Sequence, residues 1–427
     1  MKKRLLSALC AVMLLVCAVP MASAQSGDDT RMADALTVLH ILAEEPDRDL
    51  TAPATRAQAA VLLVRLSGGE KHPDTDGWFA GFRDVPEWAR TAVNYAARRG
   101  WVSGVSNVSF APNGALNADA WCAMLLRMLG YTEKAGDFEI SDAAAFAWRI
   151  GVTERQLTGT LNCGDLYESM YNALDFPYKG TETTVLARLI DSGVCTASVA
   201  NALGLLNREY TARQIADRYL SAGFQMEIYE TEEQVHDEVV ASNASGFFIT
   251  ADGLAVTNYH SIEDAIKADI VLLNGVERVL YYDTAIDIAV IKVSKTAENT
   301  RRTTSAFNHL ELVGTADIRP GDSVYAIGNP LGLGLAISSG IIASAAHELE
   351  RYALPCVVNS ADISRGSSGG ALLNTHGQVI AVTSGAYTYG NNMYLAVPVN
   401  PVMTADLTGP GWTLEEVKAI ENAKKAD

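Results

Sequence analysis

The sequence predicts two structurally different halves, an all-α half of helical repeats followed by an all-β half. Up to about residue 200, apolar residues recur three and four positions apart, which is the spacing of amphipathic helices. Beyond about residue 240 the apolar runs are short and separated by glycine-containing turns, as in a barrel or a sandwich. The 427 residues suffice for two or three domains of roughly 100–200 residues each.

Composition and charge exclude several classes of function. The chain carries 33 basic and 50 acidic residues and a net charge of -17, which repels phosphate backbones, so we expect no nucleic-acid partner. Neither a CxxC nor an HExxH motif occurs, and we expect no metal site and no cofactor. Four cysteines follow the leader, and their three possible pairings stay open, as does the alternative of buried free thiols: Cys122, Cys163, Cys195 and Cys356.

Residues 1–24 form a predicted signal peptide. A basic start, Lys2-Lys3-Arg4, precedes the apolar run from Leu5 to Val19, and Ala22-Ser23-Ala24 provides a small-residue cleavage site. The run is too short to span a bilayer comfortably, and no later stretch is long and apolar enough. We therefore expect an exported protein without a membrane span, either secreted or associated with the cell envelope.

The helical half consists of repeated pairs of helices. The expected helices cover 32–42, 57–66 after Thr55 as N-cap, a segment ending near Gly100, 118–129, and a weaker third unit over 138–151 and 165–173. Each pair is too small to bury its own apolar face, so the pairs must pack on one another.

The second unit resembles the surface-layer homology (SLH) repeat of bacterial envelope proteins. The resemblance depends on Phe82-x-Asp84-Val85-Pro86-x-Trp88-Ala89 and on Gly100-Trp101-Val102-x-Gly104, and it extends over residues 31–197. It implies a three-lobed module that binds wall-linked polysaccharide, with the arginine of Thr55-Arg56-Ala57-Gln58 in the groove. Only Arg56 matches among the three units, so we expect weak polymer binding at best; the alternative for Arg56 is a solvated residue at a helix start.

A charged segment, 198–235, is predicted as a helical connector with few contacts across it, and the strand half is predicted over 236–410 with a short tail at 411–427. The expected strands are 246–250, 254–257, 289–293, 323–327 and 379–382.

Three residues of the strand half form a candidate catalytic set: His260 at the end of a strand, Asp287 at the start of another, and Ser368 in a glycine-rich turn. A serine hydroxyl becomes a nucleophile when an imidazole removes its proton, and a buried carboxylate orients that imidazole. Asp283 is the rival acid, but Asp287 directly abuts the apolar run. In the turn, the amides of Gly366 and Ser368 are predicted to form the oxyanion hole.

These motifs resemble the HtrA/Deg type of trypsin-like serine peptidase over residues 244–400. The similarity lies in Val256-Thr257-Asn258-x-His260, Asp287-Ile288-Ala289-Val290 and Gly366-x-Ser368-Gly369-Gly370. It implies a chymotrypsin-like double β-barrel, an active site between the barrels, and hydrolysis of proteins or peptides. We expect no PDZ domain after the second barrel, and Ser367 replaces the aspartate of relatives activated from zymogens. The alternative function is a catalytically silent protease fold used for binding or cell-wall attachment.

The specificity pocket is predicted near Asp362 and Ile363. By resemblance, an apolar residue at Ile363 suits small aliphatic substrates, whereas an aspartate at Asp362 suits Arg or Lys. We expect Asp362 to turn away and bond loop amides, and cleavage to follow Val, Ala or Leu.

Overall fold

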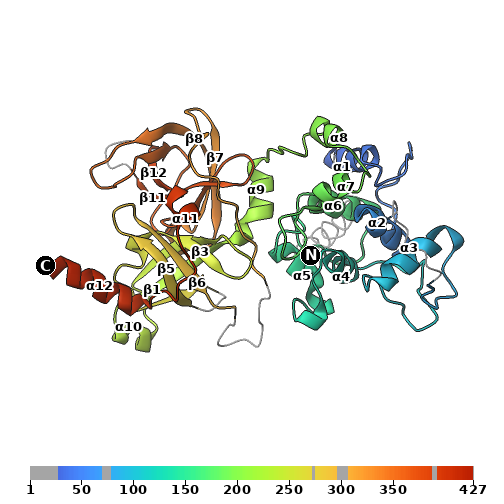
Figure 1. The fold of residues 1–427 in the computed structure, drawn as a ribbon, viewed down its shortest axis with the longest axis horizontal. Coiled ribbons are helices and arrows are strands. Elements are labelled where there is room, and N and C mark those ends of the chain that lie inside the picture. Colours follow the sequence, from blue (N-terminus) through green and yellow to red (C-terminus); the bar gives the residue numbers. More distant parts are fainter. Residues whose placement is uncertain (1–26, 70–77, 272–274, 296–305, 387–391, 427) are drawn as a thin grey trace, which may run out of the picture.

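The computed structural model describes residues 27–69, 78–271, 275–295, 306–386 and 392–426, so the predicted signal peptide at 1–24 lies outside the described residues. Figure 1 shows a helical half beside a strand half, with helix α9 between them. No helix in the described segments has the length and apolarity needed to cross a bilayer. The predicted order, helices first and strands second, is confirmed.

The helical half consists of short helices with well-formed N-caps. Thr55, Asn117 and Asn162 each begin a helix, and each side chain accepts a hydrogen bond from the backbone amide three residues later. The helices are α1 (Gly27–Val38), α2 (Arg56–Leu66), α3 (Glu87–Arg98), α4 (Ala118–Met128), η2 (Glu133–Ala135), η3 (Ile140–Asp142), α5 (Ala143–Arg149), α6 (Cys163–Ala173), α7 (Val185–Asp191) and α8 (Ala197–Ala202).

Three helix pairs give this half a three-lobed arrangement. Helix α1 packs on α6, α2 on α3, and α4 on α5. The loops that precede α2, α4 and α6 join around one centre through backbone bridges, which link Thr55 to Ala115, Asn117 to Thr160 and Pro53 to Asn162. The lobes share one buried core, which explains why no single pair needs to be stable alone.

The segment predicted as a connector begins as expected and then departs from the prediction. Helix α9 (Ala212–Tyr219) and η4 (Leu220–Ala222) are helical. Strand β1 (Gly223–Tyr229) follows at once and pairs with two strands of the first sheet, so the predicted boundary of the strand half at residue 236 is wrong. In the middle of β1, Phe224, Met226 and Ile228 are buried and the two residues between them are half-buried, which is the period of a strand.

The first sheet has six strands in the order β4-β1-β2-β3-β6-β5, and its two edge strands contact each other, so the sheet curls into a barrel. Its other elements are α10 (Glu232–Asp237), β2 (Ser242–Phe248), β3 (Leu254–Thr257), η5 (Tyr259–Ser261), β4 (Lys267–Ile270), β5 (Val276–Asp283) and β6 (Ile288–Val293).

The second sheet is a closed barrel in the order β10-β11-β12-β9-β8-β7. Its elements are β7 (Ser323–Gly328), η6 (Pro330–Gly332), β8 (Ala336–His347), β9 (Cys356–Asn359), β10 (Ala371–Leu373), β11 (Val379–Ala386), β12 (Tyr394–Pro398) and α11 (Asn400–Thr404). The predicted tail is a helix, α12 (Leu414–Ala426), which packs Leu414 and Val417 into the core of the first barrel.

The two halves are joined by a buried arginine, which contradicts the expectation of few contacts across the connector. Arg218 on α9 is 5% exposed and donates to the Glu154 carboxylate at 3.1 Å and to the Asn172 carbonyl at 3.1 Å. On its other side, the Asn308 amide donates to the Arg218 carbonyl at 2.7 Å. Helix α9 also contributes Ile215 to the core beside the second barrel, so a strand half that begins at Ala222 lacks part of this core.

All four cysteines of the described chain are buried free thiols, so none of the pairings that the sequence left open is formed.

Candidate active site

His260 and Asp287 meet between the two sheets through a pair of hydrogen bonds. His260 lies in η5, just after β3, and its Nδ1 is 2.7 Å from Asp287 Oδ2. The His260 amide also donates to Asp287 Oδ1 at 2.9 Å. Since both carboxylate oxygens bind the same residue, the ring is held in one orientation, with Nε2 away from the acid. The His260 side chain is 36% exposed, and the Asp287 side chain 8%.

The Asp287 carboxylate is buried, and its hydrogen bonds favour the ionised form. Asp287 has φ +61°, an uncommon value for a residue with a side chain, and this bend aims the carboxylate back toward His260. Burial alone would raise the pKa of Asp287, but hydrogen bonds from His260 and Ser384 outweigh burial and lower the pKa below its usual range. The Ser384 hydroxyl donates to Asp287 Oδ2 at 2.8 Å.

The rival acid, Asp283, lies at the end of β5 and has a different environment. Its Oδ1 accepts from the amides of Ala285 at 2.8 Å and Ile286 at 3.2 Å, so it closes a local turn. The described structure contains no hydrogen bond between Asp283 and His260.

Ser368 lies in the glycine-rich turn before β10, and its hydroxyl donates to the Ser384 carbonyl at 3.2 Å. Within the described residues it makes no hydrogen bond to His260. Such bonds are often long or poorly aligned until substrate binds.

The turn that contains Gly366 and Ser368 is fixed by Ser245, a fully buried residue on β2. The Ser245 hydroxyl donates to the Gly366 carbonyl at 2.7 Å, and the Ser245 amide donates to the Ser368 carbonyl at 2.8 Å. The same hydroxyl accepts from the Asn329 amide at 2.8 Å. With the carbonyls held from behind, the Gly366 and Ser368 amides have no acceptor in the described part of the chain and remain available to an external oxyanion.

At two positions of this turn only glycine fits, because neighbouring backbone atoms lie too close for a side chain. Gly366 has φ +93°, and a Cβ there would lie 2.5 Å from the Asn329 carbonyl oxygen. Gly369 has φ +87°, and a Cβ there would lie 2.2 Å from the Ser245 carbonyl oxygen. Side chains at either position would push the turn away from β2 and the loop after β7.

Asp362 and Ile363 occupy different environments. Ile363 is half-buried and packs against the interior of the second barrel, whereas Asp362 is exposed. The Tyr394 hydroxyl donates to Asp362 Oδ1, and this is the one side-chain partner of that carboxylate among the described residues. No backbone amide of the described residues donates to this carboxylate, and the expectation that Asp362 bonds loop amides stays a prediction. Tyr394 lies two residues before Ala396 on β12, so both side chains project toward the barrel interior.

Arg56 is tied to a neighbouring repeat and is not simply solvated. Its Nε donates to the Phe110 carbonyl at 3.0 Å, and its Nη2 donates to the Ser103 carbonyl at 2.8 Å. The guanidinium lies 4.8 Å from the centre of the Phe110 ring. Burial lowers the pKa of Arg56. The side chain joins the first unit to the second, and its interpretation as a solvated helix-start residue is wrong.

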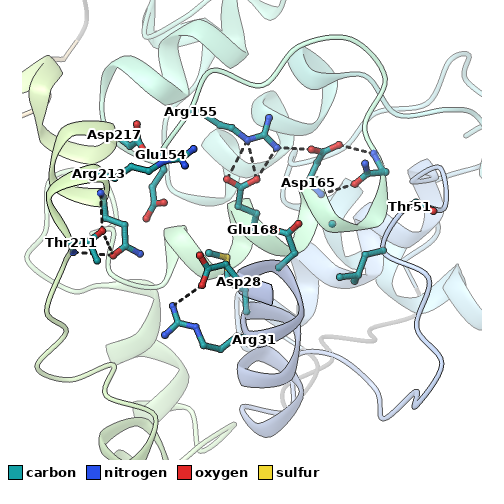
Figure 2. Close-up of a pocket in the computed structure, with 16 residues that line it drawn as sticks. Asp28, Arg31, Thr51, Glu154, Arg155, Asp165, Glu168, Thr211, Arg213 and Asp217 are labelled. Carbon is teal, nitrogen blue, oxygen red and sulfur yellow. Dashed lines mark hydrogen bonds and ion pairs between the residues drawn. The ribbon is translucent and has the colours of Figure 1, made fainter. Parts of the chain in front are cut away.

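A polar pocket lies between α1, α6 and α9, and Figure 2 shows its charged side chains turned toward one another. Its charges are paired: Arg155 with Asp165 and Glu168, Arg213 with Asp217, and Arg31 with Asp28. The lining contains more acids than bases, which disfavours an anionic polymer there.

Two residues of the site, Ser245 and Ser384, were not among the predicted site residues. Ser245 directly precedes the predicted strand 246–250, and Ser384 lies two residues after the predicted strand 379–382, but a serine next to a strand has no distinctive sequence signal. Only the pairing of distant strands brings them to the turn and to the acid.

Comparisons with known proteins agree with this geometry. Residues 244–382 match the trypsin-like peptidase domain, and residues 81–117 match the S-layer homology domain. The chain is 32% identical to the probable periplasmic serine endoprotease DegP-like of Bartonella henselae over 166 residues, which cover 38% of this chain and 31% of that protein. It is 34% identical to the DegP-like protein of Halomonas elongata, with coverage of 40% and 35%.

A third relative is the mitochondrial serine protease HTRA2 of Bos taurus, 36% identical over 161 residues, with coverage of 36% of this chain and 33% of that protein. The chain thus spans about a third of the length of these curated relatives. A solved structure, HtrA-type protease AlgW with tripeptide, aligns at a TM-score of 0.37 and 21% identity, over 45% of this chain and 61% of that one. This chain carries a chymotrypsin-like peptidase domain that resembles those of HtrA-type serine proteases, preceded by a helical module with S-layer homology.

Proposed function

We propose that this chain is an exported serine endopeptidase that hydrolyses peptide bonds of proteins through a Ser-His-Asp triad and an acyl-enzyme. Ser368 is the nucleophile, His260 the general base and then acid, and Asp287 the residue that orients the imidazole. The observation that carries the proposal is the double hydrogen bond of the buried Asp287 carboxylate to His260, at 2.7 and 2.9 Å. An aspartate that only closes a turn, or a histidine that only caps a strand, does not require two hydrogen bonds between the same two residues.

Each step of the reaction follows from these contacts. Asp287 accepts the Nδ1 proton, so neutral His260 presents Nε2 as a base, and it takes the Ser368 proton as the serine oxygen attacks the substrate carbonyl. The carbonyl oxygen becomes an anion, which the amides of Gly366 and Ser368 stabilise. His260 then protonates the leaving amine, and water repeats the sequence on the acyl-enzyme.

The choice of substrate depends on Asp362. The Asp362 side chain is exposed, and among the described residues its one side-chain partner is the Tyr394 hydroxyl, which donates to Oδ1. We therefore infer the alternative that the sequence left open, cleavage after Arg or Lys, because no basic side chain of the described residues forms an ion pair with this carboxylate and a basic substrate would supply one. Digestion of a peptide library tests this: dominant cleavage after Val, Ala or Leu, unchanged in Asp362→Ala, refutes it.

We further propose that the helical module, residues 31–197, associates the peptidase with the cell envelope only weakly. Two of the Arg56 nitrogens, Nε and Nη2, already donate to carbonyls of the second unit, which leaves fewer donors for a polymer. Pull-down on purified envelope polysaccharide tests this, and tight binding abolished by Arg56→Ala contradicts it.

A fluorophosphonate probe distinguishes the endopeptidase from a silent binding protein. The folded chain should be labelled at Ser368, and Ser368→Ala should prevent both labelling and casein hydrolysis. An unlabelled folded wild-type chain refutes the enzyme and favours the alternative of binding or wall attachment.

A further inference from the structure

A buried tyrosine lies behind the candidate acid and reaches it through one intervening hydroxyl. Tyr352 lies in the loop between β8 and β9, and its hydroxyl oxygen is 2.9 Å from Ser384 Oγ. Ser384 Oγ is in turn 2.8 Å from Asp287 Oδ2. Tyr352 and Ser384 are 8% and 5% exposed, so water competes little for these bonds.

The direction of each hydrogen bond follows from the number of protons. An ionised carboxylate only accepts hydrogen bonds, so Ser384 must donate its single hydroxyl proton to Asp287. Tyr352 is therefore the donor to Ser384 Oγ. A hydroxyl that accepts one hydrogen bond donates a stronger one, because each bond polarises the next in a low-dielectric interior. Tyr352 thus strengthens the support of the Asp287 carboxylate without touching it.

Ser384 also meets the candidate nucleophile, since its carbonyl accepts from the Ser368 hydroxyl at 3.2 Å. A shift of Ser384 would disturb both ends of the triad. The loop that carries Tyr352 has a second attachment nearby, because the Ala353 amide donates to the Ala285 carbonyl at 2.8 Å, two residues before Asp287. A loop of the second barrel therefore fixes the acid that belongs to the first.

We propose that Tyr352 is a positioning residue for the triad, acting on Asp287 and Ser368 through Ser384. This inference rests on the proposed function for its effect on catalysis. The contact gives the buried Tyr352 hydroxyl a hydrogen-bond partner within the core cluster.

The test is Tyr352→Phe, which keeps the ring in the core and removes the hydroxyl. We expect kcat to fall roughly 3- to 10-fold with KM unchanged, the effect of one hydrogen bond. The matched control is Tyr325→Phe, because Tyr325 belongs to the same core cluster and its buried hydroxyl donates to the Tyr210 carbonyl, remote from the triad. The control should lose comparable thermal stability and keep its kcat; an equal loss of kcat in both variants overturns the inference.

A double mutant separates positioning from packing. In a Ser384→Ala background, Tyr352→Phe should cause no further loss of kcat, since the path to Asp287 is already broken. Losses that multiply contradict an action through Ser384.

The His260 Nδ1 proton gives a readout that needs no turnover. This proton lies in the hydrogen bond to Asp287, whose carboxylate also accepts from Ser384. Its NMR resonance should therefore shift in Tyr352→Phe and stay unchanged in Tyr325→Phe. An unchanged resonance in Tyr352→Phe overturns the inference. If wild-type protein fails to react with the fluorophosphonate, the proposed function fails, and the Nδ1 proton resonance still decides whether Tyr352 is coupled to the acid.

Discussion

Arg56 in the helical half and His260 in the strand half are both motif residues, yet their side chains are used in opposite ways. The Arg56 guanidinium donates to two backbone carbonyls of the neighbouring repeat and covers the Phe110 ring. His260 uses Nδ1 on Asp287, and within the described residues Nε2 of its 36% exposed side chain has no hydrogen-bond partner. A side chain that donates to backbone carbonyls of a neighbouring repeat stabilises the fold, whereas one held rigidly with an open reactive atom is prepared for a substrate.

The same contrast separates the buried polar residues of the two halves. Ser169 in the helical half accepts from the Trp121 ring and donates to the Leu166 carbonyl, both inside one core. Ser245 makes the same kinds of bond, but its partners belong to the candidate oxyanion turn and to the loop after β7. The following predictions test whether the difference in surroundings produces a difference in function.

The largest expected effect comes from the triad. Ser368→Ala or His260→Ala should lower kcat on the order of 10⁶-fold, and the double variant should be little worse, because these groups act as a unit. Peptide hydrolysis under saturating substrate measures it. A Ser368→Ala protein that keeps more than a few per cent of the wild-type rate would mean that another residue is the nucleophile.

Replacing the acid comes next. Asp287→Asn should lower kcat about 10⁴-fold, because the amide favours the wrong histidine tautomer. Asp283→Asn is the matched control, and its effect should be mild since Asp283 only closes a turn. Steady-state kinetics of both variants decide the assignment, and the opposite order of effects would transfer the role to Asp283.

Asp287 also predicts a pH dependence of stability. Because its pKa is lowered in the folded state, its ionised form stabilises the fold above about pH 4, the unfolded value, and that contribution disappears as the pH falls through the folded-state pKa. Urea unfolding at several pH values should show wild type losing stability on acidification that Asp287→Asn does not lose. Parallel curves for the two proteins would contradict a lowered pKa.

Ser245→Ala should have an intermediate effect. Loss of its hydroxyl frees the Gly366 carbonyl, so the oxyanion amides lose their orientation and kcat should fall about 10- to 100-fold with little change in KM. Ser169→Ala is the control, because it removes a hydroxyl with the same bonding pattern and 2% exposure from the helical core. Both variants should lose stability, and only Ser245→Ala should lose kcat; if Ser169→Ala slows hydrolysis equally, global destabilisation is the cause.

The smallest effect on hydrolysis is expected from Arg56→Ala. The variant should keep the wild-type kcat while losing about 1–3 kcal/mol of unfolding free energy, because two carbonyls lose a charged donor. Chemical denaturation and peptide hydrolysis are measured on the same sample. Unchanged stability would show that the hydrogen bonds to Phe110 and Ser103 do not stabilise the fold. The contrast between a structural Arg56 and a reactive His260 would then no longer hold.

Local patterns of the sequence determined much of the fold. Apolar spacing located α2 and α4 closely, and Thr55 marked the start of α2, since a helix start and its periodicity are properties of neighbouring residues. The alternation in Gly223–Tyr229 was equally present, but its charged helical neighbours obscured it, and β1 was missed. The order of His260, Asp287 and Ser368 also lies in the sequence, because each residue stands at a strand end with its own local motif.

Tertiary structure alone decided which further side chains meet the candidate site. The partners of Asp287 and Gly366 are Ser384 and Ser245, which lie about a hundred residues or more from them along the chain. Arg56 links two repeats only because the fold brings the Phe110 carbonyl within hydrogen-bond distance of its side chain. A hydrogen bond between distant segments depends on strand register and on the packing of one barrel against the other, and neither is encoded in the spacing of residues near the bond.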